Sequence, residues 1–221
     1  MDSLSPSELD RVCQRVPLFP LPGIVFLPNS LLPLHVFEPR YRTLIDDALQ
    51  GYRVVAVPQL APGWEGTYED RPGVMPICGV GRIVRHQRLQ DGRHNIILLG
   101  LGRIRIEGEL ATEQPYRIAR ARLLHAHLAA TKGSADERAL QTLRALARQA
   151  AAVGHDGGSE LLRLLEQDCG PEAFVDKLAH LILRDSTARQ EYLETDVLAD
   201  RADHVAACLA AGLHPATTID A

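Results

Sequence analysis

Lysine is almost absent from this chain: it has two lysines, Lys132 and Lys177, although lysine and arginine together number 24. A phosphate-binding P-loop needs a lysine between a glycine and a serine or threonine, because that side chain reaches the terminal phosphates. Lys132 follows Thr131, and Lys177 follows Asp176, so neither belongs to such a loop. The 221 residues therefore contain no P-loop.

Cysteine is also scarce, and the four cysteines stand far apart, without a C-x-x-C pair. This spacing excludes a zinc ribbon and is typical of small buried side chains in a reducing compartment. The first ten residues carry no basic cluster, and prolines interrupt the apolar stretch that follows them. Neither a signal peptide nor a membrane helix is expected. We therefore expect a cytoplasmic protein, and one that needs no cofactor.

The pattern along the chain changes near residue 130. Before it, short apolar runs are punctuated by proline and glycine, which predicts strands; after residue 133, apolar residues recur at helical spacing. One helix interrupts the strands, from Pro39 to a stop at Gly51, with Glu38 at its cap. Strands are expected at 24–26, 31–37, 53–57, 74–88, 94–99, 102–109 and 116–124, and helices at 135–153, 159–167, 171–183, 187–193 and 197–211. Strands followed by helices predict an α+β fold.

A glycine motif occurs twice: Gly79-Val-Gly-Arg-Ile-Val84 recurs as Gly100-Leu-Gly-Arg-Ile-Arg105. A dinucleotide-binding loop needs a third glycine three residues later, at the start of a helix. Val84 and Arg105 occupy that position, and β-like residues follow. A structural role for these glycines, as a bulge or sharp bend, is therefore favoured over nucleotide binding.

Several short motifs follow one another in a fixed order: Pro17-Leu-Phe-Pro-Leu21, Leu32-Pro-Leu34, Phe37-Glu-Pro-Arg-Tyr41, Gly79-Val-Gly81, Asp91-Gly92, Gly100-Leu-Gly-Arg103, Pro115-Tyr116 and Leu178-Ala-His-Leu181. Together they resemble the Lon substrate-binding domain, which is the N-terminal domain of ATP-dependent Lon proteases. The resemblance covers about residues 15–211. It implies a PUA-like β-pseudobarrel with one inserted helix, followed by a C-terminal α-helical bundle. We therefore expect a barrel part over residues 1–130 and a helical part over residues 131–221.

The resemblance also implies a function. In the full proteases this region helps to capture unfolded or degradation-marked polypeptide, whereas the ATPase and peptidase modules lie beyond it. The chain is thus identified as a stand-alone, non-catalytic member. Its expected partners are unfolded or extended polypeptide and a protease or chaperone, and no membrane.

Aromatic side chains are the candidate peptide contacts, because such residues are enriched at binding hot spots. Trp64 and Tyr68 lie in the loop over residues 58–73, and Phe37 and Tyr41 lie at the start of the inserted helix. Glu38 is disfavoured as a catalytic acid, since an ion pair with the nearby Arg40 would keep it ionised. No catalytic residue is expected.

The alternative is an RNA-binding PUA-like module. Residues 82–122 carry nine arginines and four acids, and a basic sheet face could track RNA phosphates. Arg103 and Arg105 alternate with isoleucines and are expected to face away from the apolar side, with Arg85 on a neighbouring strand. Arginines on exposed strands also pair with acids across a sheet, and this segment has few aromatic rings for stacking bases. Nucleic acid is therefore the less favoured partner.

A metal site is not expected. His125 and His127 are two residues apart at the end of a predicted strand, so they would share one face. A site needs a third ligand, and no further histidine or cysteine lies within 20 residues of the pair.

Overall fold

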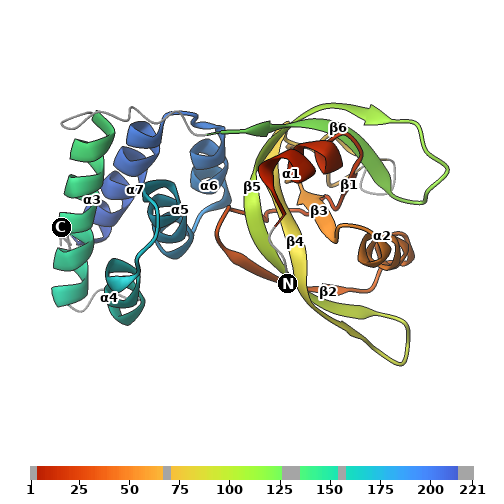
Figure 1. Cartoon of the computed structure of the whole chain (residues 1–221), viewed down its shortest axis with the longest axis horizontal. Coiled ribbons are helices and arrows are strands. Elements are labelled where there is room, and N and C mark those ends of the chain that lie inside the picture. Colours follow the sequence, from red (N-terminus) through yellow and green to blue (C-terminus); the bar gives the residue numbers. More distant parts are fainter. Residues whose placement is uncertain (1–3, 67–70, 126–134, 154–157, 214–221) are drawn as a thin grey trace, which may run out of the picture. The chain divides into compact units, whose positions relative to one another are not determined.

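The computed structural model describes residues 4–66, 71–125, 135–153 and 158–213. The chain divides into two compact units, Met1–His125 and Ala126–Ala221. The predicted boundary, after residue 130, falls in the segment 126–134, which lies outside the described residues. The first unit holds the strands and the second is helical, which confirms the predicted α+β class (Figure 1).

The first unit is built on a mixed sheet that closes on itself. Its elements are α1 (Pro6–Cys13), β1 (Val16–Leu18), β2 (Leu31–Val36), α2 (Pro39–Gln50), β3 (Val54–Val57), β4 (Ile77–Arg88), β5 (His94–Leu110) and β6 (Arg117–Leu124). The strand order is β2-β5-β4-β3-β1-β6, and β6 also pairs with β5. That second pairing closes the ring, as expected for a pseudobarrel. β2 pairs with the first half of β5, and β6 pairs with its second half.

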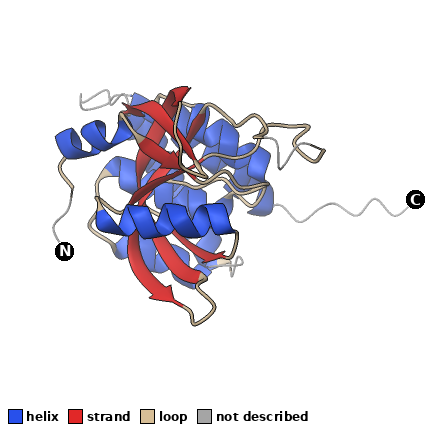
Figure 2. Ribbon diagram, turned by 90° about the vertical axis from the view of Figure 1, so that its right-hand side faces the viewer, coloured by secondary structure: helices blue, strands red, loops and turns tan. Residues whose placement is uncertain are grey.

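The inserted helix, α2, forms where it was predicted. Pro39 occupies its first turn, Glu38 is the N-cap residue and Gly51 ends it. Its buried side chains are Tyr41, Leu44 and Ile45, which belong to the main core of the unit. Figure 2 shows this helix lying across the strands. The helix therefore closes one side of the barrel.

A second apolar cluster holds α1 in place, a helix that the sequence did not lead us to expect. Leu9 and Cys13 of α1 are buried in this cluster, together with Cys78 of β4. Ser5 and Glu8 form a capping box at the start of the helix. Burial raises the pKa of the Cys13 thiol to about 11 and also raises the pKa of the Cys78 thiol. Both cysteines are thus small buried side chains, as predicted.

The repeated glycines make room for a crossing segment. A Cβ atom at Gly79 would collide with the Phe26 carbonyl, one at Gly81 with the Phe26 ring, and one at Gly100 with the Leu27 carbonyl. The β4–β5 register also shifts between Val80 and Gly81, which marks a bulge. The structural interpretation of these glycines is confirmed.

Three details of the strand prediction were wrong. The segment 24–26 is not a strand; Phe26, its last residue, lies against Gly79 and Gly81. The strands expected at 94–99 and 102–109 are one continuous strand, β5, because the bulges bend it without breaking the pairing. The three-residue strand β1 was missed, since Pro17 at its centre obscures the pattern.

The second unit contains the five predicted helices: α3 (Ala135–Ala152), α4 (Gly158–Glu166), α5 (Pro171–Ile182), α6 (Ser186–Glu194) and α7 (Leu198–Leu213). Arg201 of α7 is fully buried and forms ion pairs with Asp176 at 3.2 Å and Glu172 at 2.9 Å. The Tyr192 hydroxyl donates to the same Asp176 carboxylate at 2.6 Å. This network joins α5, α6 and α7 through a buried arginine, its two acidic partners and the Tyr192 hydroxyl. In the described parts of the chain, no helix is both long and apolar enough to cross a membrane.

Candidate functional site

The first unit presents an uncovered sheet face made by β2, the first half of β5 and the end of β4. Side chains alternate between the two faces of a strand, so Leu31, Pro33 and His35 share one side of β2. That side is exposed, whereas Leu32 and Leu34 pack against the main core. We call this exposed side the outer face.

The register aligns the outer-face side chains in rows across the three strands. Pro33 lies opposite Ile97, and Ile97 lies opposite Arg85. One row further, His35 lies opposite Asn95, and Asn95 lies opposite Gln87. Directly opposed residues in an antiparallel sheet point to the same face, so a row with two apolar side chains lies beside a polar row.

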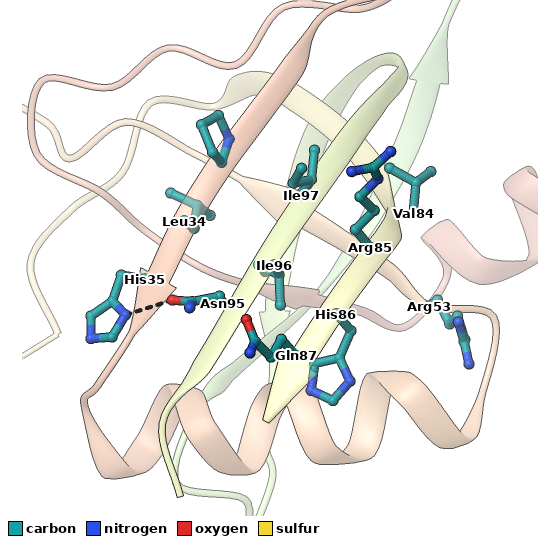
Figure 3. A pocket seen from close by; sticks show the side chains of 11 residues that line it. Leu34, His35, Arg53, Val84, Arg85, His86, Gln87, Asn95, Ile96 and Ile97 are labelled. Carbon is teal, nitrogen blue, oxygen red and sulfur yellow. Dashed lines mark hydrogen bonds between the residues drawn. The ribbon is translucent and has the colours of Figure 1, made fainter. Parts of the chain in front are cut away.

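A cavity of about 840 Å³ lies over these rows. It extends from the end of β2 across β5 to β4 and to the turn that precedes β3 (Figure 3). The residues that line it include Pro33, His35, Arg53, Arg85, Asn95 and Ile97. A cavity of this size falls in the range of pockets that bind drug-sized ligands or short peptide segments.

Apolar side chains on this face are open to solvent. Leu31 is 54% exposed and lies opposite Leu99, which is 36% exposed. Phe37, which follows β2 directly, is 59% exposed, and its ring stacks on the His35 ring with 6.3 Å between centroids. Exposed apolar side chains that adjoin one another mark interaction surfaces more often than isolated ones do.

Among the described strands, β2 is the end strand and pairs only with β5, so its other edge has no strand partner there and is called the open edge. Pro33 stands in its middle and lacks a backbone N–H, a feature typical of edge strands. An open edge still offers carbonyl groups and the remaining N–H groups to an added strand. The outer face and this edge together could hold an extended chain.

Two of the predicted contact residues, Phe37 and Tyr41, line a second, smaller cavity of about 260 Å³. Their environments differ. Phe37 is exposed, whereas Tyr41 is 5% exposed and its ring centroid lies 4.3 Å from that of Phe19. Glu38, between them, forms an ion pair with Arg40 at 2.9 Å, as predicted.

The structure does not bring Trp64 to the outer-face cavity, and it does not describe Tyr68. Trp64 is half-buried in the loop after β3 and is not among the residues that line either cavity. Tyr68 lies in the segment 67–70, outside the described residues. Their role in binding stays a prediction.

The predicted exposure of Arg103 was wrong. Its side chain is 1% exposed, and that of Arg105 is half-buried. Arg103 lies opposite Gly79, on the face that Phe26 covers, whereas Ile104 packs in the second apolar cluster. Both faces of β5 are therefore covered at this point, which an alternation count cannot detect.

Other arginines of the basic stretch pair with acids. Arg117 pairs with Glu109, while Arg120 and Arg122 both lie near Glu107, at 3.5 Å and 3.9 Å. Acidic neighbours lower the attraction of such a surface for phosphates. Of the three arginines expected to hold RNA, only Arg85 is exposed, so these three do not form one exposed basic face.

A histidine pair lies at the far end of the β4–β5 hairpin. His86 Nε2 and His94 Nδ1 are 2.8 Å apart, and His94 Nε2 lies 3.7 Å from an Asp46 carboxylate oxygen of α2. Burial lowers the pKa of His94, and Asp46 opposes that shift. Among the described residues, no group of three or more histidines, cysteines and acids could hold a metal ion. His125 is exposed, and His127 lies outside the described residues.

The sequence reasoning missed Leu31, Ile97, Leu99 and Arg53 as parts of a site. A strand run that is apolar on both faces reads as a fully buried strand. The signal that could have revealed the exposed side was Pro33 within the apolar run, because proline is largely confined to edge strands.

Residues 15–211 match the family model described as the ATP-dependent protease La (LON) substrate-binding domain. A Lon protease from Desulfosudis oleivorans is 25% identical over 84% of this chain, and one from Methylocella silvestris is 28% identical over 91%. The chain spans about a quarter or less of these relatives, 22% and 24% of their lengths.

Solved structures show the same fold. A Lon N-terminal domain protein from Xanthomonas campestris matches with a TM-score of 0.61 and 21% identity, covering 87% of this chain and 97% of its own. The N-terminal domain of the Mycobacterium avium complex Lon protease gives 0.62 and 16%, with coverages of 89% and 98%. These matches confirm the predicted barrel with C-terminal helices.

Proposed function

Because the chain belongs to the family of the ATP-dependent protease La (Lon) substrate-binding domain, we propose that it binds unfolded or extended polypeptide on its outer face. The observation that carries this proposal is the run of exposed apolar side chains, Leu31, Leu99 and Phe37, beside the open edge of β2. Unfolded polypeptide exposes apolar side chains and unpaired backbone groups, and such a surface can bind both.

The client adds to the edge of β2 as an extended segment. Its backbone pairs with the free groups of β2, while alternate side chains fall on Leu31 and Leu99 of the outer face. Phe37 closes one end of this surface as an aromatic contact. Trp64 and Tyr68 stay proposed client contacts, although Trp64 does not line the outer-face cavity.

The module takes no part in catalysis. Glu38 forms an ion pair with Arg40, and the Cys13 and Cys78 thiols are buried with raised pKa values, so these groups are unsuited to proton transfer or nucleophilic attack. The captured client passes to a protease or chaperone partner. The four free thiols suit a cytoplasmic setting.

Binding is tested with a permanently unfolded, tryptophan-free protein titrated into the full chain in a calorimeter. We expect a dissociation constant on the order of micromolar, because ordering a flexible client offsets much of the contact energy. The double variant Leu31→Asn/Phe37→Asn is expected to bind at least about fivefold more weakly, since both side chains are apolar contacts.

Leu162→Asn is the matched control, because Leu162 is 50% exposed on α4 and Leu31 is 54% exposed. It should leave the affinity unchanged. Equal weakening by both variants, or the absence of binding at high micromolar concentrations of several clients, would overturn the proposal.

A further inference from the structure

The outer-face cavity carries positive charge. Its charged lining residues are Arg53 and Arg85, and among the residues that the structure describes no aspartate or glutamate lines it. Neither arginine forms an ion pair with an acid of the described residues, unlike Arg117 and Arg120 of the same unit. The positive potential of these two guanidinium groups can therefore attract an anionic ligand.

Arg53 is fixed in an unusual backbone conformation. Its φ angle is 62°, in the left-handed region that favours glycine or asparagine. Its N–H donates to the Ala48 carbonyl at 3.0 Å, and its own carbonyl accepts from the Ile83 N–H at 2.8 Å. These bonds tie Arg53 to α2 on one side and to β4 on the other. An arginine in a position that suits glycine is an outlier that points to a role for its side chain.

Amide donors lie in the same cavity. Asn95 Oδ1 is 2.8 Å from His35 Nδ1, and because that oxygen can only accept, the imidazole N–H donates to it. The NH₂ group of Asn95 is therefore available to the cavity. Gln87, which also lines the cavity, lies opposite Asn95 in the register and carries a second amide. Figure 3 shows His35, Asn95 and Gln87 in one row, with Arg85 and Ile97 in the next.

We propose that this cavity recognises a carboxylate that stands next to apolar residues, so that acidic apolar segments are the preferred clients. The inference rests on the proposed binding of polypeptide at the outer face. Guanidinium groups bind carboxylates through paired N–H donors, and Pro33 and Ile97 supply the adjoining apolar contact. The carboxylate belongs to an aspartate or glutamate side chain or to the end of a client chain.

Fluorescent ten-residue peptides with one apolar sequence test this preference on the full chain. They carry Glu, Gln or Lys at the centre and end in an amide, and a fourth peptide carries Gln and ends in a free carboxylate. Anisotropy should give an affinity for the Glu peptide roughly three- to tenfold higher than for the Gln peptide, with Lys weaker still. The fourth peptide shows whether a terminal carboxylate serves as well as a side chain.

Arg85→Gln should abolish the preference for Glu over Gln while binding of the Gln peptide persists. Arg53→Asn should reduce the preference without lowering Tm, because asparagine tolerates the left-handed conformation. Arg120→Gln, which alters an arginine paired with Glu107, is the matched control and should keep the preference.

Equal affinities for the Glu and Gln peptides, or a preference that survives in Arg85→Gln, would overturn this inference and leave the proposed function standing. Failure of every peptide to bind would overturn the proposed function as well. Displacement of the peptide by single-stranded RNA, lost in Arg85→Gln and without any carboxylate preference, would assign the cavity to RNA instead.

Discussion

The two units of the chain use charged side chains in opposite ways. In the helical unit, Arg201 is fully buried and both of its acidic partners come from α5. In the barrel unit, Arg85 is exposed in the row of Pro33 and Ile97, and Arg53 and Arg85 line one cavity without an acid among its described lining residues. A buried, paired charge supports a fold, whereas an exposed charge beside uncovered apolar side chains is suited to recognition.

Apolar exposure shows the same contrast. The helical unit exposes Leu162 and Val153 on or just after different helices, which is normal for single surface residues. In the barrel unit, Leu31 and Leu99 are register partners on one face. The grouping of the exposed residues, more than their number, distinguishes the outer face.

The largest expected effect falls on the helical unit. Arg201→Met should lower its free energy of unfolding by about 3–5 kcal/mol, because the buried Asp176 carboxylate loses its counter-charge. Urea unfolding followed by circular dichroism measures this loss. Arg148→Met, on the exposed side of α3, is the control and should change stability by no more than about 0.5 kcal/mol. A similar small change for Arg201→Met would contradict the structural role of the network.

In the barrel unit, the largest effect should come from a glycine. Gly79→Ala places a Cβ atom against the Phe26 carbonyl, so it should cost about 2–3 kcal/mol through overpacking. Gly108→Ala, also in the sheet, is the matched control, because a Cβ there meets nothing within 4 Å. Unfolding of this unit is followed by the fluorescence of Trp64, the single tryptophan. Equal stability of the two variants would refute the crossing arrangement.

Loss of one hydroxyl should have a smaller effect. The Tyr116 hydroxyl donates to Asp47 of α2 at 2.8 Å, and burial and Asp47 together raise the pKa of Tyr116. Tyr116→Phe should therefore cost about 1 kcal/mol. Tyr52→Phe, which changes a tyrosine that is 44% exposed, should leave the urea midpoint unchanged. A midpoint for Tyr116→Phe that equals the parent's would show that this bond contributes nothing.

The pH dependence should reveal His94. Its pKa is lowered in the fold by burial, so the unfolded chain binds the extra proton first as the pH falls. Stability of the barrel unit is therefore full above the unfolded pKa of about 6.5 and declines below it. His94→Asn should flatten this decline in urea midpoints read by Trp64 fluorescence between pH 7.5 and 5.5. An unchanged slope in the variant would exclude His94 as its source.

Local patterns predicted the helices well. Pro39 and Gly51 mark the ends of α2, and helical spacing of the leucines marks the five helices of the second unit, because these signals act within a few residues. The barrel was predicted from the resemblance to the Lon substrate-binding domain.

The arrangement of the site depends on contacts between distant residues. Arg103 is buried because Phe26 covers its face of β5, and Leu31 and Leu99 stayed exposed because nothing in the described part of the barrel unit covers that face. The backbone of Arg53 is held beside the site by hydrogen bonds to Ala48 and Ile83, which are distant in sequence or on another element. Sequence periodicity records which residues share a face, but not which face is left uncovered.

The most direct test of polypeptide binding at the outer face follows methyl resonances during titration with an unfolded client. Shifts are predicted at Leu31, Ile97 and Leu99 on β2 and β5, with the control methyls of Leu162 and Val197 in the helical unit unmoved. Shifts confined to the control methyls, or no shift at any methyl with the client in large excess, would contradict the account.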